Sequence, residues 1–242
     1  MESYSALAAS YDELTQDVGY EKRAAFVEKL FLRSHIPVHT VLDLACGTGT
    51  MTALLTERGY ELIGVDGSED MLLEAREKAQ TLTGVPPLFL HQSMPELDLY
   101  GTVEAAICCL DSLNYLTEAR EVRETFRRLH LFIAPGGSLV FDVHALGKLE
   151  AMDGQVWLDE REDVYCVWRT EYSRRSRLPR RRRMGAQLRG APSALVQRFG
   201  ADRMADRRRL RRNSHLRRLP PPRPERNRRA YLYFLYPKRV IL

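Results

Sequence analysis

The sequence predicts an α/β fold, a doubly wound and mostly parallel sheet (a Rossmann-like arrangement) with helices on both faces. Two observations support this prediction. Between residues 20 and 144, segments with helical apolar spacing alternate with short apolar runs of strand type. Single helices separate these runs, so the strands are expected to pair in parallel through right-handed crossovers. A chain of 242 residues is long enough for one such domain with its own core.

The predicted elements follow one another in a regular order. In residues 20–34, Ala24 and Val27 lie on one helical face, and the run HTVLDL at residues 39–44 is typical of a buried strand. A Pro-Gly-Gly run at residues 135–137 is expected to end the last helix. The predicted helices are 20–34, 50–58, 69–82 and 117–132, and the predicted strands are 39–44, 61–65, 88–91, 103–110 and 138–144.

Charge divides the chain into two segments. Residues 1–173 contain 14 Lys and Arg against 29 Asp and Glu, whereas residues 174–242 contain 23 basic and 3 acidic residues. Residues 174–229 include 21 Arg, no Lys and six Pro, without apolar periodicity of either kind. Such a composition cannot bury a core, so we expect a domain over 1–173 and an atypical tail after it. Residues 230–242 (AYLYFLYPKRVIL) are apolar and strand-like again.

The four cysteines are expected to be small core residues in a reducing compartment, because they show no metal-ligand spacing. Cys108 and Cys109 are adjacent in an apolar run and should point to opposite faces of a strand. The sequence opens without a signal peptide and has no apolar run of membrane-spanning length. We therefore expect a cytoplasmic protein without a bound metal.

A glycine-containing turn lies where the first predicted strand meets a helix, in the run DLACGTGT at residues 43–50. Glycines there let the backbone approach a ligand, and the helix amino terminus offers unpaired N–H groups. Asp66 follows 17 residues after Gly49, at the end of the second strand. A carboxylate in that position can accept hydrogen bonds from two ribose hydroxyls. Together these features predict a nucleoside-containing ligand.

The residues around the turn favour S-adenosylmethionine over a dinucleotide. Dinucleotide-binding turns carry a third glycine three residues after the second, and that place is Thr52 here. Asp43 precedes the glycines, where a carboxylate would attract the ammonium group of a methionine moiety and repel a pyrophosphate.

At this point the sequence resembles the small bacterial class I S-adenosylmethionine-dependent methyltransferases. The resemblance rests on VLDLACGTGT, GVDGSEDML, CCLDSLNYL and FDVH, and on the opening YSALAASYDELTQD. It covers about residues 4–170 and is specific for fold and cofactor, but not for the methyl acceptor. The resemblance implies that S-adenosylmethionine is the cofactor and that the protein is a methyltransferase.

The same resemblance implies roles for individual residues. Asp43, Gly47 and Gly49 would hold the methionine end of the cofactor, and Asp66, Gly67 and Met71 would hold the ribose and adenine. Leu110 and Asp111 would line the methionine side of the pocket. Tyr11 would close over the cofactor. Two positions depart from the family pattern. The first glycine of the family loop is Ala45 here, a mild change. The Asp that commonly contacts the adenine amino group is Ser93, which could weaken adenine binding, although the backbone of Met94 could still contribute.

Methyl transfer from a sulfonium is an in-line displacement, so the protein mainly positions the acceptor, and a general base is needed only if the acceptor loses a proton. The catalytic candidates are Asn114, Tyr115 and His144, because all three follow strands at the carboxyl edge of the sheet. Each has a structural alternative: Asn114 could cap the following helix, Tyr115 could be a packing residue, and His144 a turn residue. Tyr11 could likewise belong to an amphipathic first helix.

Three explanations of the arginine-rich tail remain open. It could bind nucleic-acid phosphates, which would indicate an RNA methyltransferase. It could be a disordered tail without a role. It could also be an out-of-frame translation of GC-rich DNA, which would explain the absence of Lys and leave the sheet incomplete at its carboxyl-terminal end. We expect a small-molecule acceptor, and a cofactor-binding protein without catalysis is the alternative from another functional class.

Overall fold

The computed structural model describes residues 7–116, 118–144, 151, 155–160, 164–169, 182–188, 195–199, 217–218 and 230–235. Its centre is a seven-stranded sheet in the order β10-β11-β5-β4-β1-β2-β3. The five strands predicted from the sequence are present and pair in parallel with one another. They are β1 (Thr40–Leu44), β2 (Glu61–Asp66), β3 (Leu88–His91), β4 (Val103–Cys108) and β5 (Ile133–His144).

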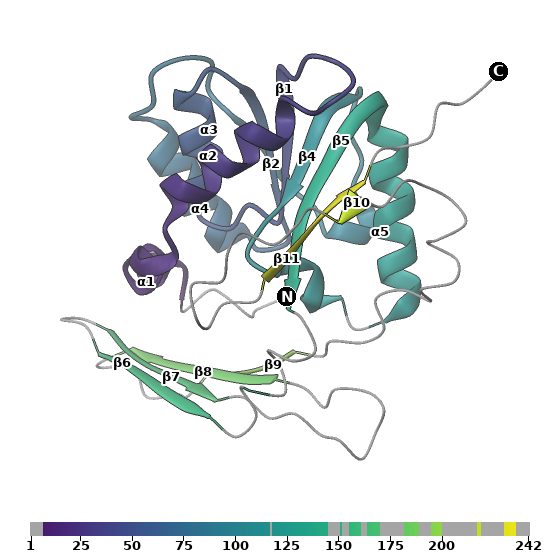
Figure 1. The fold of residues 1–242 in the computed structure, drawn as a ribbon. Coiled ribbons are helices and arrows are strands. Elements are labelled where there is room, and N and C mark those ends of the chain that lie inside the picture. The colour runs from purple at the N-terminus through teal and green to yellow at the C-terminus, as the bar shows by residue number, and fades with distance from the viewer. Residues whose placement is uncertain are drawn as a thin grey trace.

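Helices cover both faces of this sheet. The α-helices are α1 (Ala8–Leu14), α2 (Tyr20–Phe31), α3 (Thr50–Glu57), α4 (Glu69–Ala79) and α5 (Ala119–Phe132). Three single-turn 3₁₀ helices lie in the connections between the described elements: η1 (Gln16–Val18), η2 (Met94–Glu96) and η3 (Ser112–Tyr115). Figure 1 shows α2, α3 and α4 on one side of the sheet and α5 on the other. The doubly wound architecture predicted from the sequence is therefore confirmed.

The core consists of two apolar clusters, one on each face of the sheet. On one face Val27 of α2 and Leu55 of α3 pack against alternate residues of β1, β4 and β5. On the other face Leu129 of α5 packs against the intervening residues of the same strands. Cys108 belongs to the second cluster and Cys109 packs against the first, which confirms that they point to opposite faces.

The structure corrects the expected start of β5. The strand begins at Ile133 rather than residue 138, so Pro135-Gly136-Gly137 lies inside it as an irregularity where the register with β4 shifts. Gly136 has φ +89°, and its carbonyl oxygen accepts a hydrogen bond from His35 N–H at 3.1 Å. A Cβ atom at Gly137 would lie 2.4 Å from the carbonyl oxygen of Glu104. Close approach to β4 explains Gly137, and the positive φ explains Gly136, inside the strand rather than in a turn outside the sheet.

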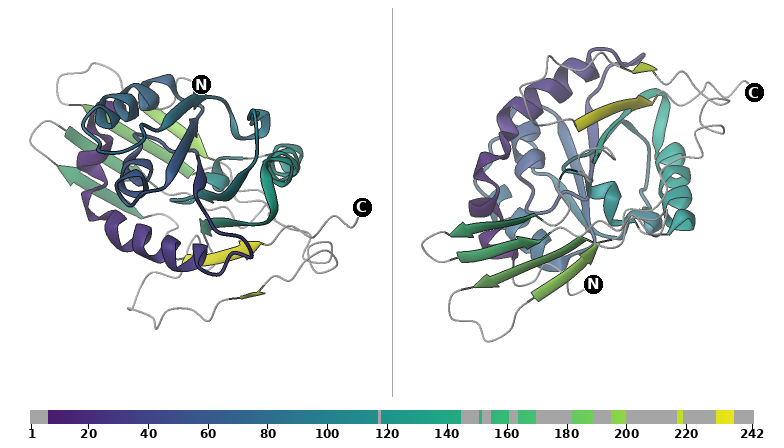
Figure 2. Two further views of the ribbon diagram at one scale, coloured as in Figure 1. Left: turned by 90° about the horizontal axis from the view of Figure 1, so that it is seen from above. Right: turned by 60° about the horizontal axis from the view of Figure 1, so that its bottom comes forward.

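A second sheet of four antiparallel strands has the order β6-β7-β8-β9. Figures 1 and 2 show it at one end of the larger sheet, on the side where α1 lies. Its strands are β6 (Val156–Glu160), β7 (Val164–Arg169), β8 (Arg182–Leu188) and β9 (Leu195–Phe199).

Two further strands extend the large sheet beyond β5. The strand-like character expected after residue 230 is confirmed by β11 (Ala230–Leu235), which pairs antiparallel with β5, and β10 (Arg217–Arg218) pairs with β11. Strands β8, β9 and β10 fall inside the arginine-rich range, most of which lies outside the described residues. The expectation that residues 174–229 contribute no core thus stays a prediction. Among the residues that the structure describes, no helix is both long and apolar enough to cross a membrane.

Candidate functional site

The turn between β1 and α3, residues 45–49, is called the glycine loop below. Gly47 and Gly49 both adopt left-handed backbone conformations, with φ of +57° and +74°. A Cβ atom at Gly49 would lie 2.9 Å from the Cβ of Ala75 on α4, so a side chain there would force α4 away. The loop ends directly at the amino terminus of α3, where backbone N–H groups are available to a ligand. Glycine is thus required here both for the turn and for close packing.

Ala45, which replaces the first glycine of the family loop, also has a left-handed backbone, with φ +60°. This conformation costs an L-amino acid about 1–2 kcal/mol, because its Cβ crowds the following carbonyl oxygen. The replacement of glycine by Ala45 therefore retains the turn but introduces local strain.

Asp43 lies beneath the glycine loop and is only 2% exposed. Its carboxylate accepts a hydrogen bond from the hydroxyl of Thr52 at 2.6 Å. Burial raises the pKa of Asp43 to about 6, and the negative charge of Asp66 contributes to the same shift, while the Thr52 hydrogen bond opposes it. Thr52, which stands where a dinucleotide-binding turn has its third glycine, therefore orients the carboxylate of Asp43. A buried carboxylate of this kind can be compensated by a cationic ligand group.

Asp66 connects the end of β2 to the glycine loop. One carboxylate oxygen accepts the backbone N–H of Gly47 at 2.8 Å, and the other accepts the N–H of Ser68 at 2.9 Å. Burial raises the pKa of Asp66, although hydrogen bonds from the Gly47, Ser68 and Gly67 backbone oppose the shift. The carboxylate has about four acceptor positions and these backbone groups use three, so Asp66 can accept a further hydrogen bond from a ligand hydroxyl.

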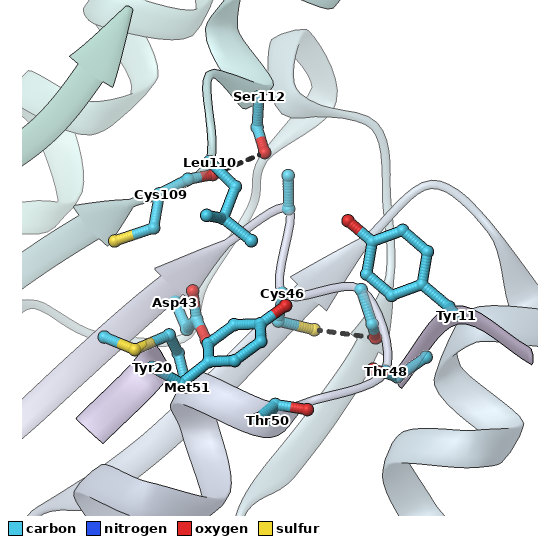
Figure 3. Close-up of a pocket in the computed structure, with 12 residues that line it drawn as sticks. Tyr11, Tyr20, Asp43, Cys46, Thr48, Thr50, Met51, Cys109, Leu110 and Ser112 are labelled. Carbon is cyan, nitrogen blue, oxygen red and sulfur yellow. Dashed lines mark hydrogen bonds between the residues drawn. The ribbon is translucent and has the colours of Figure 1, made fainter. Parts of the chain in front are cut away.

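A cleft of about 370 Å³, including its open mouth, lies beside the glycine loop. Figure 3 shows Tyr11 of α1 and Tyr20 of α2 on opposite sides of this cleft, with both hydroxyls turned toward its centre. Burial raises the pKa of Tyr11, and the charges of Tyr20, Asp111, Asp66 and Asp12 raise it further. Five predicted site residues line the cleft, namely Tyr11, Asp43, Ala45, Gly47 and Leu110, together with seven that were not predicted: Tyr20, Cys46, Thr48, Thr50, Met51, Cys109 and Ser112.

Most of the missed residues are sequence neighbours of predicted ones, so the motif itself is the signal that could have found them. Cys46, Thr48 and Thr50 alternate in sequence with the predicted residues Ala45, Gly47 and Gly49. Tyr20 is different, because it reaches the cleft from the start of α2 and carries no motif. Only the folding of α2 beside β1 brings it there.

The predicted adenine side lies at the ends of β2 and β3. A Cβ atom at Gly67 would lie 4.0 Å from Cα of Ser93, so the two strand ends are adjacent. The Ser93 hydroxyl donates to the carboxylate of Glu96, one turn further along η2, which begins at Met94. Met71 is 2% exposed within α4 and is a core residue. These residues do not line the cleft beside the glycine loop, and their contacts with a cofactor stay predictions.

The ends of β4 and β5, residues 109–115 and 142–144, form a second group that is called the β4–β5 edge below. Strand β4 ends at Cys108, two residues earlier than predicted, and Leu110 and Asp111 follow with φ of +60° and +52°. This turn brings Oδ2 of Asp111 to 2.9 Å from Nε2 of His144. Two consecutive left-handed residues other than glycine are strained, and such strain is concentrated at functional sites.

A second carboxylate supports this pair. Oδ1 of Asp142 accepts the backbone N–H of Asp111 at 3.3 Å, and Oδ2 lies 3.6 Å from the guanidinium of Arg23. Burial raises the pKa of Asp142, Arg23 opposes the shift, and the charge of Asp111 adds to it. The β4–β5 edge therefore contains two carboxylates and one imidazole, with Arg23 as a partial counter-charge.

Asn114 and Tyr115 belong to η3, next to this group. The backbone N–H of Asn114 donates to the carbonyl oxygen of Asp111 at 2.8 Å. The alternative that Asn114 caps the following helix is wrong, because α5 has Glu118 as its N-cap residue. Within the described part of the chain, the buried Oδ1 atom of Asn114 has no hydrogen-bond partner. A buried acceptor atom of this kind needs an explanation, and a ligand N–H is one.

Comparisons with known proteins agree with this geometry. Residues 41–137 match the family model described as "Methyltransferase domain". The chain is 36% identical over 170 residues to the protein YqeM of Bacillus subtilis strain 168, and 33% identical over 168 residues to a protein of Geobacillus sp. strain WCH70; both carry methyltransferase names. Each alignment covers 69% of this chain, and they cover 66% and 68% of the two relatives. The chain thus spans about two thirds of the length of these relatives.

Two further matches bear on substrate class and fold. The chain is 31% identical over 145 residues to the dTDP-3-amino-3,4,6-trideoxy-alpha-D-glucopyranose N,N-dimethyltransferase of Streptomyces venezuelae, which covers 59% of this chain and 58% of that protein. An S-adenosylmethionine-dependent methyltransferase from Clostridium acetobutylicum superposes with a TM-score of 0.77 at 21% identity, over 97% of this chain and 99% of the other. The structural match extends across both sheets.

Proposed function

Because the chain belongs to the class I S-adenosylmethionine-dependent methyltransferases, we propose that it methylates an amine nitrogen of a small-molecule acceptor at the β4–β5 edge. The observation that carries this proposal is the 2.9 Å contact between Asp111 and His144, beside the cleft and next to the buried Oδ1 of Asn114. Negative charge and hydrogen-bond acceptors dominate this edge, which suits an acceptor bearing N–H groups.

The cleft beside the glycine loop fits the methionine end of the cofactor. We assign the ammonium group to Asp43, whose buried carboxylate gains a counter-charge, and the ribose hydroxyls to Asp66. Tyr11 and Tyr20 would exclude water from the cleft. When bound, S-adenosylmethionine supplies an activated methyl group on a sulfonium, so the residues of this chain need only bind, orient and exclude water.

An amine acceptor is also favoured by relatives. The Streptomyces relative is named as an N,N-dimethyltransferase of an amino sugar, and other curated relatives are named as glycine and sarcosine N-methyltransferases. An amine nitrogen attacks through its lone pair, and one N–H proton must leave once the new N–C bond has formed. The pair of Asp111 and His144 can take that proton, because it then becomes an imidazolium–carboxylate ion pair at 2.9 Å.

The first test is methyl transfer itself. Purified protein is incubated with S-adenosylmethionine labelled in the methyl group and with pools of small amines, matched alcohols, or RNA. We expect label in the amine pool, and a loss of about 10²–10⁴-fold in His144→Asn, which is the usual contribution of a general base. Label in the alcohols or in RNA would contradict the proposed acceptor class. Cofactor binding without transfer to any pool would favour a binding protein without catalysis.

The second test separates acceptor from cofactor contacts. We expect Asn114→Ala and Tyr115→Phe to lower turnover by about tenfold while cofactor affinity changes by less than about twofold, because both residues belong to η3 rather than to the glycine loop. Steady-state kinetics and calorimetry with S-adenosylhomocysteine measure the two effects. An equal loss of cofactor affinity in both variants would assign them to the cofactor site instead.

A further inference from the structure

Four polar residues join α1 to the glycine loop and to α4. Asp12 is the residue after Tyr11 on α1, Thr48 and Thr50 flank Gly49, and Lys78 lies in the last turn of α4. Thr48 and Thr50 line the cofactor cleft, whereas Asp12 and Lys78 are not among its lining residues. We call this group the α1 clamp.

The α1 clamp is fully connected. Oδ1 of Asp12 accepts the hydroxyls of Thr48 and Thr50 at 2.6 and 3.0 Å. The ammonium group of Lys78 donates to Oδ2 of Asp12 at 2.5 Å, to the carbonyl oxygen of Thr48 at 2.9 Å and to the hydroxyl of Thr50 at 2.7 Å. All three ammonium protons of Lys78 therefore have an acceptor, and both oxygens of Asp12 are used. Such a satisfied network fixes its members more firmly than an isolated surface ion pair.

The clamp is also partly withdrawn from water. The side chains of Asp12 and Lys78 are 47% and 27% exposed, and Thr48 is only 2% exposed. Burial raises the pKa of Asp12, but the hydrogen bonds from Lys78 and Thr48 outweigh it, so that pKa lies below its ordinary value. The charged form of Asp12 is thus the stable form at neutral pH.

Helix α1 depends on contacts of this kind for its position. It has seven residues, and its N-cap residue makes no side-chain hydrogen bond. A helix of this length is not stable by itself, so tertiary contacts must hold it. Its apolar anchors are Leu7, Ala8 and Leu14, which are buried. On the side that faces the glycine loop, Asp12 contacts Thr48 and Thr50.

The geometry points to Asp12 and Lys78 as positioning residues that hold Tyr11 across the cofactor cleft and thereby slow the release of the cofactor. This inference rests on the proposed assignment of the cleft to S-adenosylmethionine. The clamp joins two parts of the cleft lining, because Asp12 adjoins Tyr11 of α1 and its carboxylate accepts hydrogen bonds from Thr48 and Thr50, which also line the cleft. Release of the cofactor requires α1 to move away from the glycine loop, and loss of the clamp lowers the barrier to that motion.

The test compares cofactor release in matched variants of the full chain. Lys78→Met removes the three donors and keeps the apolar stem, Asp12→Asn removes the charge, and the double variant combines them. Lys78→Arg is the conservative replacement. Arg76→Met is the control, because Arg76 lies on the same helix and pairs with Glu69 on α4 itself. The probe is S-adenosylhomocysteine: its dissociation rate is measured by chase with unlabelled ligand, and amide hydrogen exchange is followed over residues 8–14.

We expect Lys78→Met and Asp12→Asn each to speed release about five- to tenfold, with little further change in the double variant because both belong to one network. Lys78→Arg should restore most of the slow release, and Arg76→Met should stay within about twofold of the parent chain. Amides of residues 8–14 should exchange faster only in the clamp variants.

Two results would overturn the inference in different ways. If folded clamp variants show an unchanged dissociation rate and unchanged amide exchange while the parent chain binds normally, the clamp has no role in cofactor release. The proposed function would then stay intact. Failure of the parent chain to bind S-adenosylhomocysteine would overturn the proposed function together with the clamp. Melting temperatures of all variants identify any that fail to fold, and Thr50→Val, which removes one hydroxyl and no charge, then provides the milder variant.

Discussion

The glycine loop and the β4–β5 edge solve the same geometric problem with different residues. Each must turn the chain sharply at the carboxyl end of a parallel strand. The glycine loop uses Gly47 and Gly49 for two of its three left-handed positions, whereas the β4–β5 edge uses Leu110 and Asp111. Glycine adopts this conformation at no steric cost, while other residues pay about 1–2 kcal/mol.

The difference between the two regions follows from what each region has to hold. The glycine loop offers backbone N–H groups, so a side chain would obstruct it. The β4–β5 edge needs the side chain of Asp111 at 2.9 Å from His144, so glycine could not replace it. Under the proposed function, strain is therefore accepted where a side chain does the chemistry, and is largely avoided where the backbone does the binding.

The largest effect on the glycine-loop side is expected from Asp66→Ala. This change removes a charged acceptor from the ribose and also releases the Gly47 N–H. We expect cofactor affinity to fall about ten- to hundredfold, since hydrogen bonds to charged groups contribute about 1.5–3 kcal/mol. Calorimetry with S-adenosylmethionine measures it, with Asp98→Ala as an exposed control whose partner is Arg128. Unchanged affinity would exclude Asp66 from the site, and tighter binding of NAD would contradict the cofactor assignment.

A smaller effect is expected from the protonation of Asp43. Its pKa is about 6 in the folded protein, so it loses its charge as the pH falls through that value. Affinity for the cationic methionine end should be full above pH 6 and fall by up to about tenfold per pH unit below it. Asp43→Asn should bind weakly and without this pH dependence. Calorimetry between pH 5 and 7 tests the prediction, and a parallel decline in both proteins would assign the titration to another group.

The same shift has an opposite consequence for stability. Because the folded state raises the pKa of Asp43, it binds the proton more tightly than the unfolded chain does. The contribution of Asp43 to the free energy of unfolding should therefore decrease as the pH rises from about 4 to about 6. Chemical denaturation of the parent chain and of Asp43→Asn over this range separates this contribution from those of other carboxylates.

The smallest effect concerns strain itself and tests the comparison most directly. Ala45→Gly should raise the free energy of unfolding by about 0.5–1 kcal/mol, because relief of the left-handed strain exceeds the entropy that glycine adds to the unfolded chain. Asp111→Gly relieves similar strain but removes the contact with His144, so methyl transfer should fall. Urea denaturation and the transfer assay measure both. If Ala45→Gly lowers stability, strain does not distinguish the two regions.

The sequence predicted Asp43 and Gly47, which line the cleft, because their signals are local. Asp43, Gly47 and Gly49 lie within seven residues of one another, and Asp66 ends the very next strand. The β4–β5 edge was predicted as a set of candidates, but neither the pairing of Asp111 with His144 nor the unpartnered Oδ1 of Asn114 could be derived from their spacing.

By itself, the sequence determined the order of helices and strands between residues 20 and 144, the parallel sheet and the position of the glycine loop. Those features depend on periodicity and on backbone requirements of short segments, which neighbouring residues specify. Only the tertiary structure decided which distant side chains meet. Lys78 reaches Asp12 across 66 positions because α4 packs against α1, and Arg23 lies against Asp142 because α2 packs against β5. The strain at Ala45 and at Asp111 was likewise decided by the fold, since dihedral angles follow from how the flanking elements pack.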